Sequence, residues 1–144
     1  MLKRFSNDRP VAPNVAGKEE RGKFWSIVDQ IDEIDVSIGL SRIGGQQEVY
    51  KKMLELMVQE IEKSNNNLVE FLSAKEINSF RIEVHGIKSS LANIGSMPLS
   101  EKALDLEIAS RNEDVDFCNA NLPAFLERLN GLNLKLKEAF AAVV

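Results

Sequence analysis

Residues 77–94, INSFRIEVHGIKSSLANI, decide the fold because they carry the most regular apolar pattern in the chain. Apolar residues recur here at alternating steps of three and four, the spacing of one face of an α-helix. These positions are Ile77, Phe80, Val84, Ile87, Leu91 and Ile94. Gly95 and Ser96 end the pattern, and Pro98 suits the first turn of a following helix. The stretch therefore predicts a helix with one buried and one exposed face.

Helical spacing also runs through the segments on either side of this stretch. Upstream, a long stripe from about Gln46 to Ala74 is interrupted only by Ser64; its apolar members are Tyr50, Leu54, Met57, Ile61, Leu68 and Phe71. Downstream, a helix is expected from Pro98 to about Ser110. We therefore expect long helices both before and after residues 77–94.

A last helix has an apolar face made of Leu122, Leu126, Leu129, Leu132, Leu136 and Phe140. Its start is ambiguous because of Pro123, which has no backbone N–H to donate. Either Pro123 lies in the first turn after Asn121, or it kinks a helix that begins near Asp116. The sequence alone leaves both possibilities open.

The N-terminal third is less regular. Residues 1–17 show no periodic apolar pattern and are expected to be an extension, and residues 18–144 to be a single domain. A short helix is expected from Lys18, with a stripe that includes Phe24, Trp25, Ile27, Val28 and Ile31, and a second from Asp35 to about Ile43. Gly44 and Gly45 then break the chain before the first long helix.

Four long amphipathic helices with short connections predict an all-α fold. The most economical arrangement is an antiparallel up-down-up-down four-helix bundle, preceded by one or two short N-terminal helices. With 144 residues and 44% hydrophobic content, the chain can bury one core. A helical repeat array is less consistent with the sequence, because no segment recurs at a fixed period.

Composition argues against several classes of function. No apolar run reaches the roughly 18 residues of a membrane span, and MLKRFSNDRP lacks the apolar stretch of a signal peptide, so we expect a cytoplasmic protein without a membrane partner. Cys118 is the only cysteine, which excludes an internal disulfide and a zinc site with several thiolates. The net charge of −4 and the lack of a basic cluster argue against a nucleic-acid partner.

The only histidine, His85, is expected on the exposed face of the helix. At about 100° per residue, it lies roughly 130° from the centre of the apolar face. Arg81, Lys88, Ser89 and Ala92 fall near it on the same side. A largely neutral imidazole can attack phosphorus, and a lysine one turn away can offset phosphoryl charge. A solitary surface histidine near a lysine is nevertheless common, so this geometry is suggestive only.

The motif around His85 resembles the histidine-containing phosphotransfer (HPt) domain family of multistep phosphorelays. Residues 85–95, HGIKSSLANIG, follow its pattern of a histidine, a lysine three residues later, small residues next, and a glycine ten residues after the histidine. The resemblance extends over about residues 32–140, through 34–36, 39–45 and Tyr50 upstream and Ala103-Leu104 with Glu107 downstream. Ser89 departs from the pattern, since the family usually has glycine there; its hydroxyl would contact the phosphoryl group or narrow the range of partners.

The resemblance implies that His85 is phosphorylated and that Lys88 orients the phosphoryl group. The donor would be the receiver domain of a hybrid sensor histidine kinase and the acceptor the receiver domain of a response regulator. Arg81, Ser89, Ala92 and Ser96 are expected to contact these partners. The receiver domain would supply Mg²⁺, so no cofactor of this chain itself is expected. The sequence has no GxxxxGK[ST] loop or ATP lid, so we expect a phosphocarrier without kinase activity. We expect a monomer, because a carrier that must meet two partners in turn gains little from burying its surface.

Three alternatives remain at this point. A non-catalytic helical adaptor would bind signalling proteins through a helix face. A metal-binding bundle would need inward-facing Glu-x-x-His pairs, which this sequence lacks. An inactive family member is disfavoured because the motif is intact. Met1 favours a free-standing protein over the end of a larger sensor kinase.

Overall fold

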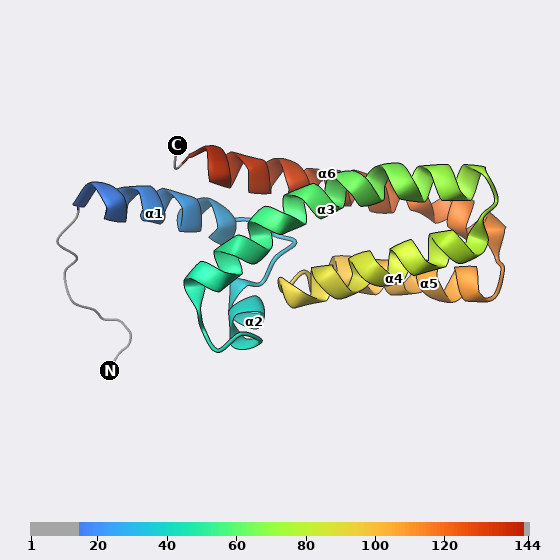
Figure 1. The fold of residues 1–144 in the computed structure, drawn as a ribbon, viewed down its shortest axis with the longest axis horizontal. Coiled ribbons are helices and arrows are strands. Elements are labelled where there is room, and N and C mark those ends of the chain that lie inside the picture. The colour runs from blue at the N-terminus through green and yellow to red at the C-terminus, as the bar shows by residue number, and fades with distance from the viewer. Residues whose placement is uncertain (1–14, 143–144) are drawn as a thin grey trace.

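The computed structural model describes residues 15–142, with side chains from residue 22 onward, and this part of the chain forms helices and no strand (Figure 1). The all-α prediction is therefore confirmed. Of the extension predicted over residues 1–17, residues 1–14 lie outside the described part, and the first helix begins at Val15 rather than Lys18. In residues 15–142, no helix is both long and apolar enough to cross a membrane.

Four long helices form the bundle. They are α3 (Gln47–Ser73), α4 (Ile77–Asn93), α5 (Met97–Arg111) and α6 (Val115–Ala141). Consecutive helices run in opposite directions, each packs against the next, and α6 closes the ring against α3 (Figure 1). This arrangement is the predicted antiparallel up-down-up-down bundle.

The core is apolar and receives side chains from all four long helices. On α4, the predicted positions Phe80, Val84, Ile87, Leu91 and Ile94 are buried, and Ile77 is half-buried. Ser64, the one interruption in the α3 stripe, is also buried, and its hydroxyl donates a hydrogen bond of 2.7 Å to Glu83 of α4. Because the hydroxyl has a partner, this polar residue does not disrupt the packing.

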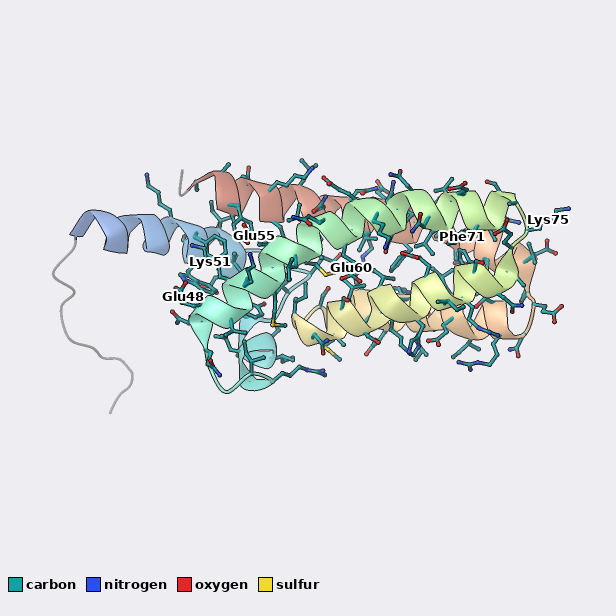
Figure 2. The ribbon with its side chains drawn as sticks, viewed as in Figure 1. Glu48, Lys51, Glu55, Glu60, Phe71 and Lys75 are labelled. Atoms are coloured by element: carbon teal, nitrogen blue, oxygen red, sulfur yellow. The ribbon has the colours of Figure 1, made fainter. Side chains whose placement is uncertain are left out.

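The three turns of the bundle share one backbone conformation. Lys75, Gly95 and Glu113 each adopt a positive φ just after a helix ends. In each turn the next N–H donates a 2.8 Å hydrogen bond to a carbonyl in the last turn of the preceding helix, as in a Schellman motif. Figure 2 shows Lys75 at the turn between α3 and α4. Only one of these positions is glycine, so the sequence signalled only one of the turns clearly.

The ambiguity at Pro123 is resolved in favour of the longer helix. Asp114 caps α6 by accepting a 3.0 Å hydrogen bond from the Phe117 N–H, and the helix begins at Val115. Pro123 therefore lies inside α6 and not in its first turn.

Two N-terminal helices cover one end of the bundle. In α1 (Val15–Asp29), the Phe24 ring lies 4.9 Å from that of Phe140 on α6, and Trp25 stacks on Tyr50 of α3 at 6.1 Å. The short α2 (Val36–Ser41) is capped by Asp35. Between them, Glu33 accepts two hydrogen bonds of 2.8 Å from Arg128 of α6. This bidentate pair fastens the α1–α2 connection to the bundle.

Two glycines let α2 pack tightly against the turn between α4 and α5. The Asp35 N–H donates a 3.0 Å hydrogen bond to the Gly95 carbonyl, and the buried Tyr50 hydroxyl donates one of 2.7 Å to the Ile94 carbonyl. A Cβ at Gly95 would lie 2.2 Å from the Asp35 carbonyl oxygen, and one at Gly39 would lie 2.3 Å from the Tyr50 ring. Larger residues would therefore push α2 away from the bundle.

Replacing Gly95 with alanine should destabilise the protein more than replacing Gly44. Both residues have positive φ, but a Cβ at Gly44 would meet nothing within 4 Å. Gly44→Ala should therefore cost only the conformational strain, about 1 kcal/mol, whereas Gly95→Ala should cost about 2–4 kcal/mol because of the added clash. Urea denaturation followed by circular dichroism measures both, and equal losses would contradict a tight contact between Gly95 and Asp35.

Candidate functional site

His85 lies in the middle of α4 on the face that points away from the core. Its side chain is 61% exposed, while Val84 and Ile87 beside it are buried. The predicted outward orientation of the imidazole is confirmed. The buried neighbours hold α4 in place, so the position of the ring is set by the packing of the bundle.

A buried carboxylate from α5 contacts this imidazole. Glu107 has a side chain only 7% exposed, and its Oε2 lies 2.8 Å from His85 Nδ1. Its Oε1 accepts a 2.6 Å hydrogen bond from Lys88 Nζ, and Arg111 Nη2 lies 3.5 Å from Oε2. One carboxylate thus joins three basic side chains from two helices.

Glu107 is the site residue that sequence reasoning missed. The sequence analysis used it only as part of the family resemblance, without a role at the site. A signal was present, because Glu107 lies one turn after Ala103 on the buried face of α5. A carboxylate on such a face needs basic partners, and His85 and Lys88 on the preceding helix could supply them.

The surroundings of Glu107 favour its ionised form. Burial acts to raise the pKa of this carboxyl, but the hydrogen bonds and positive charges of Lys88 and His85 outweigh burial, so the pKa lies below its usual value of 4.5. An ionised carboxylate can only accept hydrogen bonds. His85 Nδ1 must therefore carry the proton, which leaves the lone pair of a neutral ring on Nε2.

The other predicted site residues differ in accessibility. Lys88 has 24% of its side chain exposed, and its backbone carbonyl accepts a 3.0 Å hydrogen bond from the Ser100 hydroxyl. Ser89 is exposed, and its hydroxyl donates a 3.1 Å hydrogen bond to the His85 carbonyl. Arg81 and Ala92 are half-buried on the same helix. The structure thus brings Lys88 into the Glu107 network and leaves Ser89 at the surface.

Ser96 requires a correction, because it was expected at the docking surface. Its side chain is 0% exposed, and its hydroxyl is buried at the turn between α4 and α5. The backbone of Ser96 closes that turn through its N–H, which bonds to the Leu91 carbonyl. Its role in this structure is to shape the turn, and no partner can reach its side chain.

Two exposed apolar side chains lie close in sequence to His85 and Glu107. Ile82, one turn before His85, is 67% exposed, and Leu104, one turn before Glu107, is 38% exposed. Within residues 15–142, no group of three or more histidine, cysteine, aspartate or glutamate side chains is arranged to hold a metal ion. The described site consists of one imidazole, one carboxylate and the cations around them.

Replacing Glu107 with glutamine should destabilise the fold in a pH-dependent way. At neutral pH the loss should be about 1–3 kcal/mol, because charge-assisted hydrogen bonds to Lys88 and His85 are weakened. The pKa of Glu107 is lowered in the folded state, so its stabilising contribution is complete above pH 4.5 and disappears as the pH falls through the folded-state pKa. Urea denaturation at several pH values should show the two proteins converging in acid.

Glu101→Gln is the matched control, because Glu101 lies on the exposed side of the same helix. It should change the free energy of unfolding by less than about 0.5 kcal/mol at every pH. A loss for Glu107→Gln that stays constant from neutral to acidic pH would contradict the role assigned to the carboxylate.

Comparisons with known proteins agree with the fold and with the motif. The family model described as Hpt domain matches residues 52–142, more than half of the 144 residues. Searches of curated proteins and of solved structures returned no match. The matched region includes His85, Lys88 and Glu107 and nearly all of the four-helix bundle. The chain therefore belongs to the Hpt domain family.

Proposed function

We propose that this protein carries phosphoryl groups on His85 between the receiver domains of a two-component phosphorelay. The observation that carries the proposal is the 2.8 Å contact between Glu107 and His85 Nδ1, made by an imidazole that is 61% exposed. Glu107 holds the proton on Nδ1 and directs Nε2 away from α5. The nucleophilic atom is then accessible to another protein, and the ring cannot turn freely.

The reaction consists of two transfers between nitrogen and oxygen. In the first, Nε2 attacks the phosphorus of an aspartyl phosphate, the N–P bond forms, and the P–O bond to the donor carboxylate breaks. The proton stays on Nδ1, so the ring becomes a cation that faces the Glu107 carboxylate. In the second transfer, an aspartate of another receiver domain takes the phosphoryl group, and the ring returns to its neutral form.

Lys88 is proposed to stabilise the charge on the phosphoryl group during both transfers. It lies three residues after His85, and its ammonium group is held 2.6 Å from Glu107 while remaining partly exposed. This position keeps a positive charge beside the imidazole. Glu107 therefore serves both residues, since it orients the nucleophile and places the cation.

The proposed partners are the receiver domain of a hybrid sensor histidine kinase and that of a response regulator. A receiver domain presents an acidic pocket that holds Mg²⁺, so the basic and apolar surroundings of His85 complement it. Arg81, Ser89 and Ala92 lie on the same helix as His85, and the exposed Ile82 offers apolar contact area. In this scheme the metal and the acidic residues belong to the receiver domain, and this chain provides the nucleophile.

Incubation with phosphoramidate should add one acid-labile phosphoryl group to the parent protein and none to His85→Gln. His85 is the only histidine, so an acid-labile phosphoryl group that the parent gains and His85→Gln does not must be attached to His85. Intact-mass spectrometry at neutral pH measures the gain. Equal labelling of His85→Gln, or failure of both phosphoramidate and a panel of phosphorylated receiver domains to label the parent, would overturn the proposal.

Lys88→Ala should slow transfer from a phosphorylated receiver domain by about 10- to 100-fold, because it removes the positive charge beside the transferring group. Lys102→Ala is the matched control, since Lys102 is an exposed lysine of α5 and should have little effect. Rapid-quench measurement of phosphorylated His85 gives both rates. Equal rates for the two variants would remove Lys88 from the mechanism.

A further inference from the structure

We infer that the receiver domain reaches His85 over Gly86, on the side of α4 that faces α3, and that the missing side chain at Gly86 provides the room for this approach. This inference rests on the proposed function, and it goes further by assigning a direction of approach and a residue that controls it. Three features of α4 support it: the orientation of the imidazole, the sides on which its neighbours lie, and the space above Gly86.

The orientation of the imidazole separates its two nitrogens. Nδ1 is held by Glu107 of α5 at 2.8 Å, so one edge of the ring faces α5. Because Nδ1 and Nε2 lie on different edges of an imidazole, Nε2 points away from that carboxylate. The incoming phosphorus must lie in line with Nε2. The donor carboxylate behind that phosphorus therefore approaches from the edge of the ring opposite Glu107, while Lys88 stays beside the imidazole.

The neighbours of His85 along α4 lie on opposite sides of it. At about 100° per residue, Gly86 lies about 100° from His85 in one direction and Lys88 about 60° in the other. Lys88 reaches Glu107, so its side faces α5. Gly86 therefore lies toward α3, and Figure 2 shows Glu60 on the part of α3 that faces α4. Consistent with this placement, Ser90 of α4 donates a 2.8 Å hydrogen bond to Glu60.

The fold itself does not require glycine at position 86. Gly86 is exposed inside a regular helix, its φ is not positive, and a Cβ built on it would meet no atom within 4 Å. Glycine lowers helix stability relative to alanine, so the position loses stability without a packing reason. What glycine provides there is open space on the α3 side of His85.

Ser89 leaves this space open in spite of its hydroxymethyl group. Its hydroxyl donates a 3.1 Å hydrogen bond to the His85 carbonyl one turn earlier, which holds the side chain down against the helix. The surface on this side of His85 is thus low at both Gly86 and Ser89, and the exposed Ile82, one turn before His85 on the same side, offers apolar contact to the receiver domain. A receiver loop can come close to the helix here, and a larger side chain at Gly86 would obstruct it.

The test compares substitutions at Gly86 with the same substitutions at Gly131. Gly131 is also exposed within a long helix, and a Cβ there would likewise meet nothing within 4 Å, but it lies on α6 away from His85. Gly86→Ala, Gly86→Leu, Gly131→Ala and Gly131→Leu are purified together with the parent. Alanine and leucine favour helices, and circular dichroism confirms that each variant is folded.

Each protein is phosphorylated with phosphoramidate and, separately, with purified receiver domains that were loaded with acetyl phosphate and label the parent. Dividing the second rate by the first cancels any change in the reactivity of His85 itself. The ratio should fall at least tenfold for Gly86→Leu, less for Gly86→Ala, and stay at the parent value for both Gly131 variants.

The possible failures can be told apart. If receiver domains label the parent on His85 but the ratio for Gly86→Leu equals that of the parent, the approach over Gly86 is wrong and the proposed function stands. If neither donor labels the parent, the proposed function fails and the inference fails with it. A graded fall at Gly86 alone supports both.

Discussion

The arrangement of side chains around His85 depends on one buried carboxylate. Glu107 can be buried between α4 and α5 because His85 and Lys88 bring hydrogen-bond donors to it, and removal of these partners would leave a poorly solvated charge with only the 3.5 Å contact to Arg111. The positions of His85 and Lys88 depend on Glu107 in turn. The carboxylate orients the imidazole and draws the ammonium group toward it, so the packing of α4 against α5 and the orientation of the His85 ring cannot vary independently.

The other side of α4 is held by a second set of polar contacts. Glu83 accepts hydrogen bonds from Ser64 and Asn67, and Ser90 donates one to Glu60, so α3 and α4 are joined along the side opposite Glu107. At the end of α4, Gly95 admits the backbone of Asp35. These contacts fix α4 against rotation and sliding. The exposed imidazole of His85 can therefore keep a constant position on the surface of one helix.

Helical periodicity was sufficient to predict the four long helices and the outward position of His85, because these follow from the spacing of apolar residues. The antiparallel order followed from the short connections between the helices. Contacts between helices were harder to predict. Glu107 is separated from His85 in sequence and becomes its neighbour only when α5 packs against α4. Ser96 was placed at the surface because the tight turn that buries it depends on the backbone of Gly95 and Leu91.

At Ser89, where the sequence departs from the family motif, the direction of the side chain matters more than its size. A serine adds atoms where glycine is usual, yet its hydrogen bond to the His85 carbonyl directs these atoms along the helix. Gly86, on the side of His85 away from Glu107, has no side chain at all. Open space beside His85 is therefore retained at a different residue. A motif that requires small residues at fixed positions does not register that Gly86 can take the place of a glycine at position 89. Comparing the sides of the helix on which the two residues lie does register it.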